Sequence, residues 1–132
     1  MKERSSFRLC YTLYMKNIVI SSLYLIILLC LSVFVFDPSY LYYELPWLDI
    51  PMHIMGGFGV ASLTGAVLSY KHYKVSYVKL FIVYVVAALC WEGYEYVKNI
   101  LAYSDWSGWF DTAKDLIDGL IGMSIAYFFV RK

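Results

Sequence analysis

The sequence predicts an all-α protein, a bundle of four transmembrane helices that forms a single membrane domain over residues 1–132. The chain is 61% hydrophobic with a mean hydropathy of +0.62, well above the usage of a soluble domain. A helix needs about 20 mostly apolar residues to cross about 30 Å of hydrocarbon. Four windows of that length are present, at residues 17–36, 51–70, 77–97 and 112–130.

The first window, residues 17–36, is longer than the apolar region of a secretion signal, and no small-residue cleavage site follows it. We therefore expect it to be retained as the first transmembrane helix.

The basic residues predict how the bundle is oriented. Nine of the eleven lysines and arginines fall in the N-terminal segment, in the connection between the second and third windows, and at the C-terminus. Even numbers of spans separate these segments, so they share one side of the membrane, which the positive-inside rule makes the cytoplasm. Both termini are then expected to lie in the cytoplasm, and the bundle itself in the cytoplasmic (inner) membrane. The basic residues are too dispersed for a nucleic-acid partner. They are Lys2, Arg4, Arg8, Lys16, Lys71, Lys74, Lys79, Arg131 and Lys132.

The acidic residues gather on the opposite, extracytoplasmic side. Counting back about 20 residues from Arg131 brings Asp111 to the outer boundary of the fourth helix, which leaves Asp115 and Asp118 in the outer leaflet. Glu92 lies about a turn and a half inside the outer end of the third helix. Intramembrane acids are costly and usually functional. Nine of the ten acids are on this side: Asp37, Glu44, Asp49, Glu92, Glu95, Asp105, Asp111, Asp115 and Asp118.

Three helices present ionisable side chains at this same depth, each set spaced to share one helical face. The sets are Asp49 with His53, Glu92 with Glu95, and Asp111 with Asp115 and Asp118. The face of Asp49 and His53 continues as small residues at four-residue steps, and small residues also follow Asp118. These small residues are Gly57, Ala61 and Gly65, and Gly119, Gly122 and Ala126. Small faces let helix backbones approach closely, so we expect the carboxylates to meet in one pocket.

Gathered carboxylates repel one another and resist desolvation, so such a cluster needs protons or cations to neutralise it. Hard oxygens and one imidazole suit a divalent metal ion such as Mg²⁺, Mn²⁺, Ca²⁺ or Zn²⁺, and no cysteine accompanies them. The metal's identity stays open. The expected ligands are Asp49, His53, Glu92, Glu95, Asp111, Asp115 and Asp118, with Glu92 or His53 as the base if the site is catalytic.

Simpler roles are also open for several of these residues. Asp49 stands two residues before a proline, as an N-cap does, and Asp111 is also placed to cap a helix. Glu95 is spaced to pair with Lys98 on its own helix. The helix dipole favours acids in a first turn but does not reach as far as Asp118. Trp91 and Tyr94 are expected to form walls of the site.

Three stretches, "DIPMHIMGGFGVA", "WEGYEY" and "DTAKDLIDGLIG", resemble the D-x-x-x-H, E-x-x-E-like and D-x-x-x-D blocks of small bacterial membrane proteins of the VanZ-like and YjdF-like kind. The resemblance covers the last three windows. The glutamine after the glutamate and the arginine before the final aspartates that VanZ-like chains often carry are not evident, which favours the YjdF-like side. The resemblance implies a polytopic membrane protein of the cell envelope, linked in some members to glycopeptide resistance, and points to Asp49, His53, Glu92, Asp111 and Asp115.

Three functions fit these expectations. The first is a metal-dependent hydrolase or transferase that acts on a membrane lipid or a lipid-linked headgroup at the outer surface. The second is a non-catalytic structural or interaction protein whose metal joins the outer helix ends. The third is a cation- or proton-binding transport component, which usually needs access from both sides of the membrane. A homo-oligomer or another membrane partner is compatible with each.

Overall fold

The computed structural model describes residues 2–36, 41–102 and 109–131, and within them it is helical with short connections and no strand. The predicted all-α membrane bundle is therefore confirmed. Its elements are α1 (Lys2–Leu31), a π-helical turn (Ser32–Phe36), α2 (Leu41–Glu44), a 3-10 turn (Pro46–Leu48), α3 (Asp49–Tyr70), α4 (Tyr77–Ala102) and α5 (Trp109–Val130).

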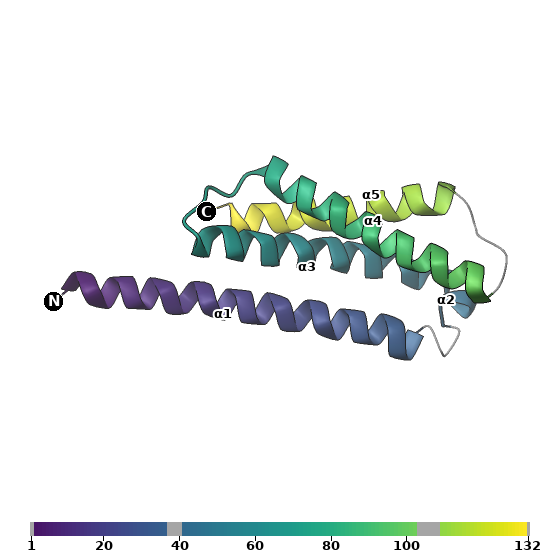
Figure 1. Cartoon of the computed structure of the whole chain (residues 1–132), viewed down its shortest axis with the longest axis horizontal. Helices are drawn as coiled ribbons and strands as arrows, with labels where there is room; N and C mark the ends of the chain where they lie inside the picture. Colours follow the sequence, from purple (N-terminus) through teal and green to yellow (C-terminus); the bar gives the residue numbers. More distant parts are fainter. Residues whose placement is uncertain (1, 37–40, 103–108, 132) are drawn as a thin grey trace.

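Three segments are long and apolar enough to cross a membrane: Thr12–Phe36, Pro46–Tyr70 and Tyr77–Lys98. The fourth long helix, α5, is 22 residues long, as α3 is, but it is not among these three segments. Lys114, Asp115 and Asp118 interrupt its apolar sequence. It still packs along α3, its most extensive neighbour, so α5 belongs to the bundle (Figure 1).

The helices extend beyond the apolar windows that predicted them. α1 begins at Lys2, well before residue 17, because residues 2–16 contain no glycine or proline that would stop a helix. α4 continues past residue 97 to Ala102. Hydropathy marks the part of a helix that suits hydrocarbon and does not mark where the helix ends.

The chain ends lie at the same end of the bundle, together with the connection between α3 and α4 (Figure 1). The short α2, the start of α3, the end of α4 and the start of α5 lie at the other end (Figure 1). This arrangement confirms that the basic segments share one end and that the acids of α3, α4 and α5 lie toward the opposite one.

α3 and α5 pack with their backbones in contact, through the small residues that the sequence singled out. A Cβ added to Gly57 would collide with the Gly119 carbonyl, and one added to Gly122 would collide with the Ile54 carbonyl. A side chain at either glycine would therefore push the two helices apart. The buried core follows this seam, at Ala61, Leu80, Tyr84, Met123 and Ala126.

Two tyrosine hydroxyls tie the outer helices to this pair. Tyr24 of α1 donates a hydrogen bond to the carbonyl of Met55 in α3 at 3.1 Å. Tyr84 of α4 donates one to the carbonyl of Leu116 in α5 at 2.6 Å. In each bond a hydroxyl donates to a carbonyl within a helix, which gives the hydroxyl a hydrogen-bond partner without water.

α3 ends in a left-handed turn at His72, whose φ is 59°. The Tyr73 backbone N–H then donates to the Leu68 carbonyl at 2.8 Å, which satisfies a carbonyl of the last helical turn. His72 is exposed.

Candidate functional site

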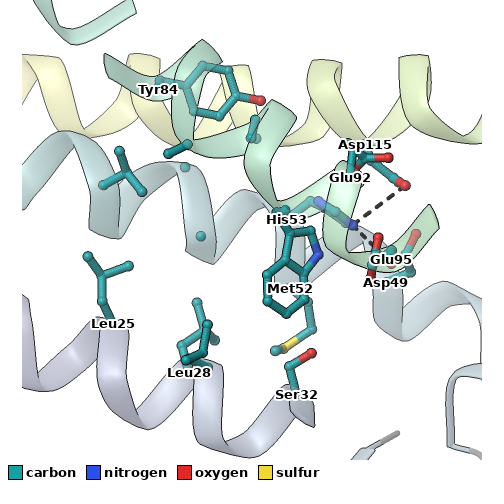
Figure 2. Close-up of a pocket in the computed structure, with 18 of the residues that line it drawn as sticks. Leu25, Leu28, Ser32, Asp49, Met52, His53, Tyr84, Glu92, Glu95 and Asp115 are labelled. Carbon is teal, nitrogen blue, oxygen red and sulfur yellow. Dashed lines mark ion pairs between the residues drawn. The ribbon is translucent and has the colours of Figure 1, made fainter. Parts of the chain in front are cut away.

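A pocket of about 380 Å³ lies among α1, α3 and α4, and α5 contributes to its wall (Figure 2). Its two ends differ in chemistry. Leu25 and Leu28 of α1 line the apolar end, whereas Asp49, Glu92 and Asp115 line the polar end. The volume is within the range of about 300–1,000 Å³ that small-molecule sites occupy.

The pocket is open on the flank of the bundle. Ile26 and Leu29 of α1 line it and are nevertheless 56% and 52% exposed. Both residues lie inside the span Thr12–Phe36, away from its ends. The mouth therefore faces the region that lipid tails occupy in a membrane.

One group of charges, the Lys114 cluster, joins α3 to α5. The Lys114 Nζ is 2.7 Å from Asp49 Oδ2 and 2.5 Å from Asp115 Oδ1, and 3.7 Å from Asp118 Oδ2. Asp115 is 4% exposed and Asp118 is 14% exposed. The ammonium thus lies among three aspartates that would otherwise repel one another.

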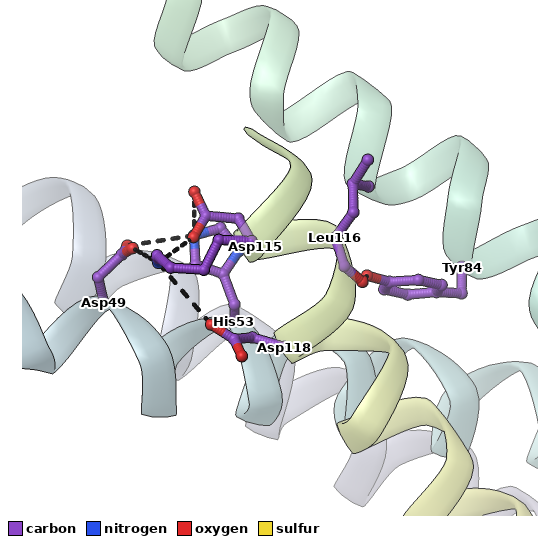
Figure 3. Close-up of polar contacts among 7 residues, drawn as sticks. Asp49, His53, Tyr84, Asp115, Leu116 and Asp118 are labelled. Atoms are coloured by element: carbon purple, nitrogen blue, oxygen red, sulfur yellow. Dashed lines mark hydrogen bonds and ion pairs between the residues drawn. The ribbon is translucent and has the colours of Figure 1, made fainter. Parts of the chain in front are cut away.

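His53 connects the Lys114 cluster to the pocket. Its Nε2 is 3.2 Å from Asp49 Oδ1 and 3.6 Å from Asp115 Oδ2 (Figure 3). The imidazole also lies close to Glu92 and Glu95 of α4. We call His53, Glu92 and Glu95 the pocket trio. One donor atom from each member lies within 4.8 Å of the others, and the same holds for Asp49, His53 and Asp115.

The pocket trio differs from the Lys114 cluster in its counterions. Lys114 and His53 form ion pairs with Asp49 and Asp115, and Lys114 also with Asp118. Glu92 and Glu95 are partly buried, and both line the pocket. Among the described residues, the lining of this end of the pocket contains carboxylates and no lysine or arginine.

The structure brings five of the seven expected ligands to the wall of one pocket: Asp49, His53, Glu92, Glu95 and Asp115. Asp118 lies on the side of Lys114, outside the pocket lining, and its buried Oδ2 has no hydrogen-bond partner among the described residues. Asp111 is exposed and belongs to neither group of possible metal ligands. Whether any of them holds a metal stays a prediction.

The capping interpretation of Asp49 is wrong. Leu48 occupies the N-cap position of α3, and no side chain caps this end. The Asp49 carboxylate contacts His53 and Lys114 instead. Because these partners come from two helices, Asp49 helps to hold α3 against α5.

Sequence reasoning missed the importance of Lys114, because a metal ion or protons were expected to neutralise the acids. A local signal was present: Lys114 is adjacent to Asp115 and four residues before Asp118. That spacing predicts an ion pair within α5. It gives no indication of the third partner, Asp49, which lies 65 residues away along the chain.

Trp91 lines the pocket beside the trio, as expected of a wall residue. Tyr94 is 44% exposed, and its ring packs on Trp91 with centroids 5.4 Å apart. Tyr94 thus supports the wall from outside the lining.

The model of a protein family described as predicted membrane protein (DUF2238) matches residues 7–132. The chain belongs to this family. The match includes all four long helices, so the first helix is part of the family's shared domain as much as the acidic helices are. The family's description agrees with the membrane bundle. Searches of curated proteins and of solved structures found no match.

Proposed function

We propose that this protein binds a divalent metal ion at the pocket trio and uses it on a lipid or lipid-linked headgroup at the cell envelope. The observation that carries the proposal is the trio itself: His53, Glu92 and Glu95 present donor atoms within 4.8 Å of one another at the end of an open pocket. The Lys114 cluster already contains a cation, so the trio is the better place for a metal.

One imidazole and two carboxylates suit Mn²⁺, Zn²⁺ or Mg²⁺ better than metals that prefer thiolates. Three protein ligands leave coordination positions for a substrate oxygen or a water, which is the arrangement of catalytic rather than structural metal sites. Such an ion would polarise a phosphoryl or carbonyl oxygen. Asp49 contacts His53 and is placed to orient its ring.

The position of the pocket favours a substrate held in the membrane. Its mouth opens on the flank of the bundle, where lipid chains lie. By the positive-inside rule, the basic end faces the cytoplasm and the trio lies in the outer half of the inner membrane. The resemblance to VanZ-like and YjdF-like proteins supports a role at the bacterial cell envelope.

A structural role is the second candidate, and the Lys114 cluster favours it. That cluster shows one cation joining α3 to α5. A metal at the trio would join α3 to α4 in the same way and stabilise the fold by mass action. Transport is less well supported, because the opposite end of the pocket is lined by apolar residues of α1.

Elemental analysis of the full chain, purified in a neutral detergent, tests the proposal together with turnover on bacterial lipid extracts. We expect about one divalent ion per chain and a changed headgroup in the lipid extract, both lost in Glu92→Gln/Glu95→Gln. Asp111→Asn is the matched control, since Asp111 is exposed and outside both clusters. Metal without turnover would support the structural role. Wild type that binds no divalent ion would contradict both.

A further inference from the structure

We propose that the pocket also takes an amphiphile with a primary ammonium head, whose apolar chain enters sideways between α1 and α4. This inference goes beyond the proposed function, because it concerns an organic cation and does not require a metal. It depends on three observations: the charge of the pocket lining, the ammonium already bound by the neighbouring cluster, and the shape of the apolar end.

The lining selects the charge of the ligand. Four carboxylates line the pocket, from Asp49, Glu92, Glu95 and Asp115, and no lysine or arginine among the described residues does. Asp49 and Asp115 already share the Lys114 ammonium, so Glu92 and Glu95 are the pair that would face a ligand. In a medium of low dielectric constant, ionised carboxylates repel a phosphate or carboxylate head and attract a cation. The pocket therefore disfavours an anionic amphiphile on its own.

Lys114 shows that this environment accepts a primary ammonium. Its Nζ donates to Asp49 Oδ2 at 2.7 Å and to Asp115 Oδ1 at 2.5 Å. Glu92 and Glu95 offer two further carboxylates on the pocket side of His53. A ligand ammonium with three N–H donors would make the same kind of charge-assisted bonds there. Trp91 in the adjacent wall adds an aromatic face that favours cations.

The apolar end of the pocket favours an amphiphile over a small cation as the ligand. A metal ion alone would leave most of the pocket of about 380 Å³ without a ligand. Leu25 and Leu28 of α1 and Val60 of α3 line that space. The exposed Ile26 and Leu29 at the mouth provide an apolar path from the lipid region. An alkyl chain attached to the ammonium would fill this end.

Tryptophan quenching in phosphatidylcholine nanodiscs tests the inference with the full chain. The probe is a primary alkylamine with bromine on its chain, which quenches a tryptophan in contact with it. A brominated alkyl maltoside with the same chain is the uncharged comparison. Subtracting the signal of Trp91→Phe isolates the tryptophan in the pocket wall. We expect half-maximal quenching of Trp91 at an amine concentration about tenfold below that of the maltoside.

Two sets of variants separate pocket binding from contact with bulk lipid. Gly56 and Gly93 both have open space for a side chain, but only Gly56 is among the pocket-lining residues. Gly56→Phe is expected to abolish saturable quenching by either probe, whereas Gly93→Phe behaves like wild type. Glu92→Gln/Glu95→Gln is expected to remove the roughly tenfold preference for the amine.

Equal quenching by the amine and the maltoside in wild type would overturn the inference, because the pocket would then accept any chain. Quenching that survives Gly56→Phe would also overturn it, because the probe would be reaching Trp91 from outside. Metal content measured on the same samples keeps the two proposals apart. Bound metal without an amine preference contradicts this inference alone, and an amine preference in metal-free protein contradicts the proposed function alone.

Discussion

The interface between α3 and α5 and the flank between α1 and α4 differ in how closely their helices approach. At the first, Gly57 and Gly122 bring the two backbones into contact, and the Lys114 cluster adds ion pairs. At the second, α1 and α4 line opposite sides of an open pocket. The two regions meet at His53, which contacts Asp49 and Asp115 and also belongs to the pocket trio.

The comparison indicates that the α3–α5 interface stabilises the bundle and that the flank between α1 and α4 serves binding. Close packing of α3 on α5 fixes the position of the charged residues, because a backbone in contact with another backbone has little freedom to shift. The looser flank leaves space for a ligand. Substitutions at the first interface should therefore change stability, and substitutions around the pocket should mainly change binding.

The largest effect on stability is expected from a side chain at the closest backbone approach. Gly122→Val would drive its methyl groups into the Ile54 carbonyl, so we expect the free energy of unfolding to fall by about 3 kcal/mol or more. Unfolding by sodium dodecyl sulfate, followed by circular dichroism, measures it. Gly93→Val is the control, with a change below about 1 kcal/mol because open space surrounds Gly93. Equal losses in both variants would contradict the assigned packing.

Removing the ammonium of the Lys114 cluster comes next. Lys114→Met leaves Asp49, Asp115 and Asp118 without their shared cation, and we expect a loss of about 2 kcal/mol. The expected loss is smaller than for a fully buried ion pair because the Lys114 side chain is 41% exposed. Adding Asp115→Asn to Lys114→Met should recover part of the loss in the same unfolding assay. A double variant less stable than Lys114→Met would show that repulsion among the aspartates is not the cause.

A smaller loss is expected from the hydrogen bond that ties α4 to α5. Tyr84→Phe removes the hydroxyl that donates to the Leu116 carbonyl at 2.6 Å, which should cost about 1 kcal/mol. Tyr94→Phe, at an exposed position on the same helix, serves as the comparison and should leave the unfolding midpoint unchanged. If the two variants unfold alike, the hydroxyl of Tyr84 does not hold the helices together.

The smallest expected effect is a gain in stability, from a substitution in the turn that ends α3. His72 has a φ of 59°, which a residue with a side chain adopts at a cost. His72→Gly should therefore stabilise the protein by about 0.5 kcal/mol. Lys71→Gly provides the contrast, since its φ of −82° gives glycine no advantage. A destabilised His72→Gly would show that the imidazole contributes more than the strained backbone costs.

The bundle could be predicted from sequence because hydropathy and small-residue spacing depend on one helix at a time. Glycine and alanine at four-residue steps on α3 and α5 indicate close packing without knowledge of the partner. The true start of α1 at Lys2 could not be predicted in this way, because polar residues continue a helix as readily as apolar ones when no breaker intervenes.

The candidate site was only partly predictable for a similar reason. Periodicity indicated which face of each helix is polar, and five of the expected ligands do line one pocket. The rotation of α5 determines which of its acids reach the pocket, and no pattern in the sequence reports that rotation. Asp115 therefore reaches the pocket, Asp118 turns toward Lys114, and Asp111 stays exposed.

Titration with Mn²⁺ followed by electron paramagnetic resonance tests most directly the claim that the pocket trio is a cation site. Wild-type protein in neutral detergent is predicted to bind about one Mn²⁺ per chain, and Asp111→Asn is predicted to bind it equally well. Glu92→Gln/Glu95→Gln should leave the Mn²⁺ free in solution. Binding that persists without these two carboxylates, or that disappears with Asp111, would contradict the account.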